Sequence, residues 1–316
     1  MTLRHKQLVS VVIPAFNARH TISLAIQSGL SQTVDVEIVV CDDASEDETA
    51  SVVEGYSDDR IRLIRNEKNM GEGPARDRAI AEARGEWIAL LDADDAWHPR
   101  RLEGLLDAAG ADTDRMVFDD ILECHHNSRA LVPWRRMRGN GAYGAHGVGV
   151  DVPIAEWARS KRLLIKPLIP AASLRASGVV HSRRRFGEDT EFFLKLLAAG
   201  LKLRYLPEAY YYYRISPGSM TASRLRHIQM EEVLEQAIMM FANNEAMVES
   251  LRLRLKQEQR NETYSRFMWA LKDRDYTEAM RRSLAKPWLI AELFKRTVHE
   301  LPYHGHRIWH RGSGRN

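Results

Sequence analysis

Carboxylate side chains gather directly after two apolar runs in the first hundred residues. Asp42 and Asp43 follow residues 37–41, and the string Asp92-Ala-Asp-Asp95 follows residues 87–91. A buried carboxylate is costly unless it is paired or bound to a cation. A divalent metal that carries a nucleotide diphosphate would offset this cost, because Mg²⁺ and Mn²⁺ accept carboxylate and phosphate oxygens together. The two strings therefore predict a site for a metal-bound nucleotide diphosphate.

Helix capping is the alternative interpretation of these aspartates. Aspartate is favoured at the N-terminus of a helix, and each string precedes a predicted helix. Capping accounts for one aspartate in a string, such as Asp95. It does not account for Asp92 directly after a buried strand, nor for the Asp42-Asp43 doublet. We therefore favour the metal and nucleotide interpretation, above all for Asp43 and Asp94.

Short β-branched runs alternate with segments of helical spacing in this part of the chain. This order is typical of βαβ units, which predict an α/β fold with a mostly parallel sheet. Ligands bind where the carboxyl ends of such strands meet, so the acidic strings and Pro14–Asn17 should lie at one edge. The predicted strands are residues 9–13, 37–41, 61–64 and 87–91, and the predicted helices are residues 20–30, 47–56, 73–83 and 99–109.

The composition is that of a folded globular protein. The 316 residues are 44% hydrophobic and 28% charged, which excludes disorder for most of the length. Only two cysteines occur, so a disulfide framework is excluded and a reducing compartment is favoured. No apolar run approaches the roughly 18–20 residues that cross a bilayer. Residues 8–16 are interpreted as a buried strand and not as a signal peptide. We expect a cytoplasmic protein.

Four motifs, in this order, resemble family 2 glycosyltransferases of the GT-A fold. The resemblance covers residues 9–105 well and residues 165–220 more loosely. It implies an inverting, metal-dependent transfer of a sugar from a nucleotide diphosphate donor, with UDP as the expected nucleotide and Mg²⁺ or Mn²⁺ as the metal. The motifs are Val9-Ser-Val-Val-Ile-Pro-Ala-Phe-Asn17, Glu37-Ile-Val-Val-Cys-Asp-Asp-Ala-Ser-Glu-Asp-Glu-Thr49, Asn69-Met-Gly-Glu-Gly-Pro-Ala-Arg76 and Gly85-Glu-Trp-Ile-Ala-Leu-Leu-Asp-Ala-Asp-Asp-Ala-Trp97.

The resemblance also implies roles for the residues that match these motifs. Either Asp94 or Asp95 is the expected metal ligand, because the family varies in which carboxylate reaches the ion. The expected donor-binding residues are Pro14, Ala15, Phe16 and Asn17 beside the base and ribose, Asp43 at the base, Arg76 near the base or diphosphate, and Asp92 with Asp94 as the Asp-x-Asp pair.

Asp189 is the residue that the resemblance implies as the general base. It lies in Phe186-Gly-Glu-Asp189, which is similar to the family's Glu-Asp motif, and it opens a predicted helix over 188–199. An inverting transfer needs a carboxylate that accepts the proton of the acceptor hydroxyl, and a helix N-terminus favours the ionised form. The alternative is that Glu188 and Asp189 only cap the helix.

Three further residues are weaker candidates for contact with the acceptor or the diphosphate. Glu188 shares the Glu-Asp motif, and Arg185 ends an arginine run that suits phosphate contact, although such a run is more often a solvated surface. Arg214 lies in a segment that resembles the family's Tyr-Arg-x-His sequence, with Ser216 in place of the histidine. No third metal ligand is therefore assigned.

A change of pattern predicts a domain boundary near residue 222. Apolar residues recur at helical spacing beyond it. The expected organisation is a GT-A catalytic domain over 1–222, with a nucleotide-binding half at 1–110 and an acceptor half at 111–222, and a helical C-terminal region over 223–316.

The residues expected on the acceptor side and the C-terminal tail predict a protein that acts at a membrane surface. Ile165-Lys-Pro-Leu168 and the arginine run resemble enzymes that extend bacterial exopolysaccharides of the succinoglycan type on a lipid carrier. Residues 281–316 hold eight Lys/Arg and two Glu, a charge of +6 in a chain of net +3, with apolar residues among them at 288–294. A basic amphipathic helix binds anionic membranes, so we expect peripheral contact at the inner face of the cytoplasmic membrane. Packing on the catalytic domain is the alternative.

Two other classes of protein compete with this interpretation. A nucleotidyltransferase on a similar sheet would place a glycine-rich loop with lysine after the first strand, where Pro14–Asn17 stands. An inactive nucleotide-sugar-binding relative would have lost carboxylates, but Asp94, Asp95 and Asp189 are intact. Nucleic-acid binding by the tail is not expected, since its aromatic and basic residues are too few for a defined platform.

Overall fold

The strands of this protein form one mixed sheet. The computed structural model describes residues 7–126, 131–139, 142–144, 149–160, 162–215 and 226–295. In these residues the strand order is β3-β2-β1-β4-β9-β6-β10-β5, with β7 paired to β6 and β8 paired to β10. The strands are β1 (Val9–Ala15), β2 (Val36–Asp42), β3 (Ile61–Arg65), β4 (Trp87–Leu90), β5 (Ala96–Trp97), β6 (Arg115–His126), β7 (Leu131–Arg136), β8 (Val150–Val152), β9 (Leu168–Pro170) and β10 (Lys202–Ile215).

The N-terminal half of the sheet is parallel and buried. β1 pairs in parallel with β2 and β4, and β2 pairs in parallel with β3. Every residue of β1 and β2 is buried, as expected for β-branched strands covered by helices on both faces. The four strands predicted in this half are confirmed, and their carboxyl ends meet at one edge.

An antiparallel strand joins this half to the rest of the sheet. β9 lies between β4 and β6 and is antiparallel to both. β10 runs parallel to β6, with a register shift between Leu206 and Tyr211. The predicted α/β class with a mostly parallel sheet is confirmed, and the antiparallel pairs involve β5, β7, β8 and β9.

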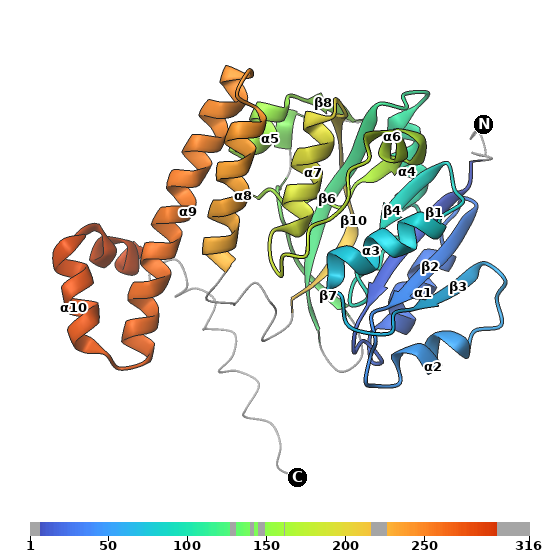
Figure 1. Cartoon of the computed structure of the whole chain (residues 1–316), viewed down its shortest axis with the longest axis horizontal. Coiled ribbons are helices and arrows are strands. Elements are labelled where there is room, and N and C mark those ends of the chain that lie inside the picture. Colours follow the sequence, from blue (N-terminus) through green and yellow to red (C-terminus); the bar gives the residue numbers. More distant parts are fainter. Residues whose placement is uncertain are drawn as a thin grey trace, which may run out of the picture. The chain divides into compact units, whose positions relative to one another are not determined.

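Helices cover both faces of the sheet (Figure 1). One hydrophobic cluster packs α3, α5, α6, α7 and α8 against the face that carries Val12, and a second packs α1 and α4 against the face that carries Val11 and Ile13. The helices are α1 (Ile22–Leu30), α2 (Thr49–Glu54), α3 (Glu72–Glu82), α4 (Arg101–Ala109), a 3₁₀ turn at Ala142–Gly144, α5 (Ile154–Arg159), α6 (Ala171–Ser177), α7 (Glu188–Ala198), α8 (Arg226–Met240), α9 (Glu245–Lys272) and α10 (Tyr276–Ala285).

The chain divides into two compact units, Met1–Leu255 and Lys256–Asn316. The first unit extends beyond the boundary predicted near residue 222. Helix α8 and the start of α9 belong to it because their side chains, among them Val233, Leu234 and Met247, pack in the same cluster as α7. The helical character predicted for this region is present, but its first helix completes the core of the α/β unit.

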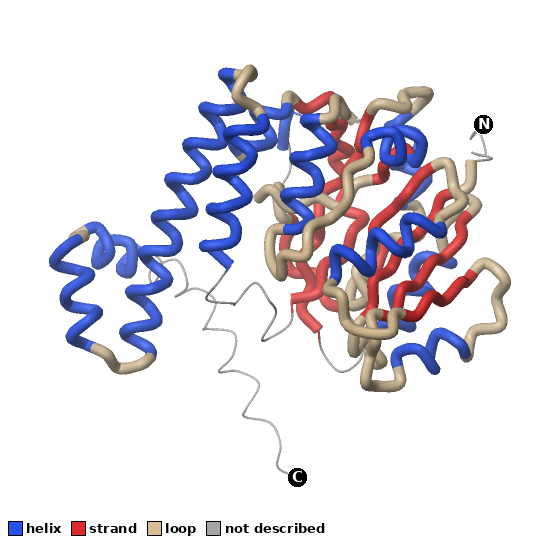
Figure 2. The backbone as a smooth tube through the Cα atoms, viewed as in Figure 1, coloured by secondary structure: helices blue, strands red, loops and turns tan. Residues whose placement is uncertain are grey.

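The described part of the second unit consists of helices joined by short loops (Figure 2). Helix α10 begins at the cap Asp275, whose side chain accepts a hydrogen bond from Glu278 N. It packs, with helical residues 288–295, against the second part of α9 through Tyr264, Phe267 and Leu289. In the described residues no helix has the length and apolar character needed to span a bilayer.

Candidate active site

Five charged side chains from four parts of the chain meet inside the first unit. Arg76 on α3 is fully buried and contacts Glu72, Asp92 and Asp189. Lys166, which precedes β9, is also buried, and its Nζ lies 2.6 Å from Asp92 Oδ2 and 2.9 Å from Asp189 Oδ2. We call these five residues the charged cluster. It brings together the predicted donor-binding Arg76 and Asp92 with the predicted base.

The tight packing of α3 against the segment before α7 makes this meeting possible. Gly73 lies in the first turn of α3, and a Cβ added there would come within 2.6 Å of Ser182 O and 2.8 Å of His181 Cβ. A larger residue would therefore push the helix away. Because Arg76 follows one turn later, the close approach at Gly73 brings its guanidinium to Asp189.

Two neighbouring carboxyl groups at the start of α7 have opposite protonation tendencies. Burial raises the pKa of Asp189, but Arg76 and Lys166 outweigh it and hold that pKa well below its usual range. Burial raises the pKa of Glu188 to about 8, and the carboxylates of Asp189 and Glu72 add to the effect. At neutral pH Asp189 is thus ionised, whereas Glu188 favours its protonated form.

The turn Asp92–Asp95 is fastened to β10. Tyr211 Oη donates to Asp95 Oδ2 at 2.7 Å, and Arg214 N donates to Asp95 Oδ1 at 2.8 Å. Arg214 Nε donates to the backbone oxygen of Asp94 at 2.6 Å. Asp95 is fully buried and both of its oxygens are occupied, so it anchors the turn. Arg214 lies beside this turn, and its contact with a diphosphate stays a prediction.

Asp94 is the carboxylate of this turn that is open to solvent. Among the described residues, no group of three or more His, Cys, Asp or Glu side chains is arranged to hold a metal ion. Mg²⁺ is commonly bound through one or two carboxylates together with substrate phosphates and waters. The donor set therefore fits a metal that binds together with a diphosphate, and it does not form a preformed cage.

The loops that follow β1 and β2 are tied to each other. Asn17 adopts a φ of +50°, a left-handed conformation in which asparagine is enriched. Its N–H donates to Ser45 Oγ, and its Oδ1 accepts from Glu46 N, both at 2.9 Å. Of the four residues predicted beside the base and ribose, Pro14 and Ala15 are buried in β1, Asn17 shapes the loop, and the side chain of Phe16 is half exposed.

Asp43 organises the loop that leads into α3. Its carboxylate accepts hydrogen bonds from Met70 N, Gly71 N and Asn66 Nδ2 at 2.5–3.0 Å. Gly71 has a φ of +93°, which a residue with a side chain adopts only with strain. Asp43 thus holds this loop through internal hydrogen bonds, and its contact with the nucleotide base stays a prediction.

The arginine run before α7 separates into two kinds of residue. Arg183 and Arg185 are exposed, as a solvated surface or a phosphate contact would both require. Arg184 instead bridges Glu191 on α7 and Glu232 on α8. Ser216, which stands in place of the expected histidine, lies outside the described residues.

Lys166 is the main site residue that the sequence analysis missed. The signal that points to it is a single lysine in the apolar run Leu163-Leu-Ile-Lys-Pro-Leu-Ile-Pro170. A charge in such a run is buried with a partner far more often than alone. Tyr211 was also missed, since nothing in its sequence pairs it with Asp95.

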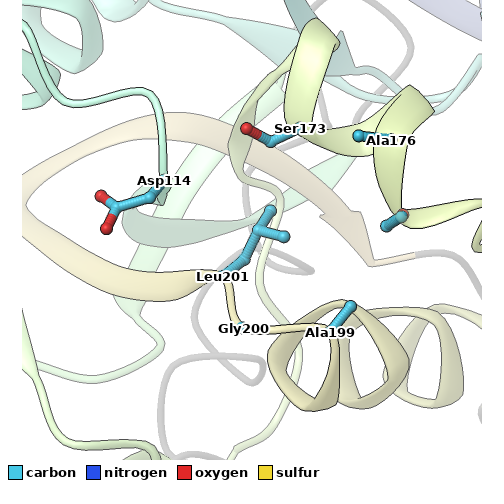
Figure 3. Close-up of a pocket in the computed structure, with 7 residues that line it drawn as sticks. Asp114, Ser173, Ala176, Ala199, Gly200 and Leu201 are labelled. Atoms are coloured by element: carbon cyan, nitrogen blue, oxygen red, sulfur yellow. The ribbon is translucent and has the colours of Figure 1, made fainter.

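A pocket of about 270 Å³ lies where β6 and β10 begin, at the opposite ends of the strands from the acidic turn. Figure 3 shows the residues that line it. It is lined by residues that precede β6 and β10, such as Asp114 and Leu201, and by Ser173 on α6. Its one carboxylate, Asp114, is paired with Lys202 and Arg115. This hollow therefore lacks the chemistry of the charged cluster.

Comparison with known proteins identifies the family. Residues 10–155 match the family model described as glycosyl transferase family 2. The succinoglycan biosynthesis protein ExoO of Rhizobium meliloti (strain 1021) is 30% identical over 303 residues, which are 90% of this chain and 83% of that protein. The chain belongs to glycosyl transferase family 2. It is therefore a glycosyltransferase.

Further members and a solved structure agree with this assignment. WfgD of Escherichia coli, a UDP-Glc:alpha-D-GlcNAc-diphosphoundecaprenol beta-1,3-glucosyltransferase, is 47% identical over 97 residues, 30% of this chain and 38% of that protein. The crystal structure of S. aureus TarS 1–349 in complex with UDP-GlcNAc has a TM-score of 0.64 at 20% identity, covering 81% of this chain and 72% of that one. The GT-A fold expected of this family 2 chain is confirmed.

Proposed function

We propose that this glycosyltransferase moves a sugar, with inversion, from a UDP-sugar to a saccharide on a lipid carrier in exopolysaccharide synthesis. The names of ExoO and WfgD support the pathway, the nucleotide and the carrier. The observation that carries the proposal is the charged cluster. Asp92 after β4 and Asp189 at the start of α7 share Arg76 and Lys166 as partners, which supports a site in which the proposed donor-side carboxylate and the proposed general base act together.

In this proposal each side chain has a stated task. Phe16 and Asn17 flank the uracil and ribose of the donor, with Pro14, Ala15 and Asp43 shaping the loops behind them. Asp189 accepts the proton of the acceptor hydroxyl as that oxygen attacks the anomeric carbon. Asp94, with Asp95 fixing its turn, would hold Mg²⁺ or Mn²⁺, which neutralises charge on the departing diphosphate. Arg185 and Glu188 remain candidates for acceptor contact.

The metal assignment predicts a defect in donor binding for Asp94→Asn. Loss of the exposed carboxylate should raise the Mn²⁺ concentration needed for half-maximal thermal stabilisation by UDP at least about tenfold, because the site offers one or two protein ligands only. Asp59→Asn removes a charge that is also exposed, in the loop before β3, and serves as the control. Wild-type metal dependence in Asp94→Asn would exclude Asp94 as the ligand. A panel of UDP-, GDP- and TDP-sugars in the same assay identifies the nucleotide.

We also propose peripheral membrane contact through the second unit. Part of the apolar tail packs inward, since Leu289 is buried with Trp288 and Leu293 against it. An outer stripe remains: Tyr276, Met280 and Leu284 are exposed at every fourth position of α10, and Ile290 and Phe294 repeat this spacing. Basic residues flank the stripe, namely Arg281, Arg282, Lys286 and Lys295. Apolar side chains with basic neighbours suit an anionic lipid surface.

The membrane proposal predicts that Met280→Glu with Leu284→Glu lowers sedimentation with phosphatidylglycerol vesicles at least about tenfold, through lost apolar burial and added repulsion. Met239→Glu with Met240→Glu, also exposed but on α8, is the matched control and should sediment like the wild type. Equal sedimentation of the α10 variant and the wild type would contradict the proposal.

A further inference from the structure

Lys166 joins two carboxylates that come from distant parts of the chain. Its side chain is 3% exposed, and its Nζ contacts Oδ2 of Asp92 and Oδ2 of Asp189. Arg76 contacts Oδ1 of each of the same two carboxylates. The four groups therefore form a closed ring of alternating charge, in which each carboxylate gives one oxygen to the guanidinium and the other to the ammonium. This arrangement fixes Asp189 relative to Asp92.

The backbone of Lys166 is held from the other side. Arg101 donates to Lys166 O, and its guanidinium binds both carboxylate oxygens of Asp119 on β6. Residues 165 and 168 are fully buried. The backbone that carries the Lys166 ammonium is thus buried and hydrogen-bonded, unlike that of a flexible surface lysine.

Stability alone gives a weak reason for a lysine at this position. The cost of removing two charges from water often exceeds their attraction, and apolar residues of similar size are commonly as stable. The run around Lys166 is otherwise apolar, so such a residue would continue it. The cation therefore points to a task in the site.

We propose that Lys166 is a positioning residue for the transfer step, which orients the base Asp189 and ties it to the donor-side Asp92. This inference rests on the proposed function, in which Asp189 is the base. In this role Lys166 acts through the two carboxylates that it contacts.

The charges around Asp189 determine the sign of the pH effect. Arg76 faces it from α3, Lys166 from the segment before β9, His181 from the segment before α7, and Glu188 from α7 itself. Burial raises the pKa of Asp189, whereas Arg76 and Lys166 lower it further than burial raises it. Loss of the lysine charge should therefore raise the pKa of Asp189. As the pH falls, the variant should then lose the activity that needs ionised Asp189 at a higher pH than the wild type does.

The test compares Lys166→Met with Lys166→Arg and Lys195→Met. We expect Lys166→Met to lower kcat at least about tenfold and to change KM for the UDP-sugar by a smaller factor. The acid limb of its kcat–pH profile should move to higher pH. Lys166→Arg keeps the cation and should leave the limb near its wild-type position. Lys195 is paired with Glu191 on α7 outside the ring, so Lys195→Met should match the wild type in all three readouts.

The outcomes separate this inference from the proposed function. A folded Lys166→Met enzyme with unchanged kcat and acid limb, beside an inactive Asp189→Asn enzyme, overturns the positioning role and leaves the base in place. Activity in both variants overturns the base itself. Lys166→Gln is made in parallel, and failure of both neutral variants to fold would assign Lys166 a structural task only and overturn the proposal.

Discussion

Asp189→Asn is expected to lower kcat by about 10²–10⁴-fold, the contribution typical of a general base. Asparagine keeps the size of the side chain but has no basic oxygen. Donor affinity, measured by calorimetry with UDP and Mn²⁺, should stay close to that of the wild type. The reason is that Asp92 keeps its contacts with Arg76 and Lys166.

Glu191→Gln is the matched control for this substitution. It makes the same change two residues later on α7, but Glu191 faces Lys195 and Arg184 and not the charged cluster. The control should retain most of the activity. A near wild-type kcat in Asp189→Asn would remove Asp189 from the chemistry and leave it a structural role as the partner of Arg76 and Lys166.

Arg101→Met is expected to lower the free energy of unfolding by about 3–5 kcal/mol, because it leaves the carboxylate of Asp119 buried without its cation. Arg101 is fully buried, binds both oxygens of Asp119 and lies over the rings of Trp97 and Tyr211. Methionine fills part of the volume, so the lost charge dominates the effect. Urea denaturation monitored by circular dichroism measures it.

Arg100→Met provides the comparison, since the neighbouring arginine has an exposed side chain paired with Glu103 on the surface. Such a pair contributes about 0–1 kcal/mol. A loss of less than about 1 kcal/mol in Arg101→Met would show that Asp119 finds another partner or a proton. Activity should fall with stability in Arg101→Met, because Arg101 also binds the backbone oxygen of Lys166.

The parallel core could be predicted from the sequence because its signals are local. β1 and β2 are rich in valine and isoleucine, and α1 and α4 place their apolar residues on one face. Two of the strands that were not predicted, β9 and β7, are short or exposed. β9 has three residues, the last of them Pro170, and most of β7 is exposed. Their pairing depends on partners far away in the chain, which periodicity does not report.

The candidate site was predictable where a motif carries it. The carboxylates Asp92, Asp94 and Asp189 stand out in the sequence, and the structure brings Asp92 and Asp189 together. What their oxygens bind was not predictable. Asp43 and Asp95 proved to hold loops, and the ring partner Lys166 lies in an unremarkable apolar run. These contacts follow from tertiary packing and not from spacing.

The place of β9 in the sheet limits how this enzyme can be divided. A fragment that ends at Gly110 would keep four parallel strands and most of the nucleotide-facing loops, yet β4 would have a bare edge because its neighbour is β9. Unprotected edges invite aggregation. The same fragment would lack Lys166 and Asp189. Chimeras that exchange specificity between relatives should therefore be joined after α7, so that β4, β9, Lys166 and Asp189 all come from the same parent.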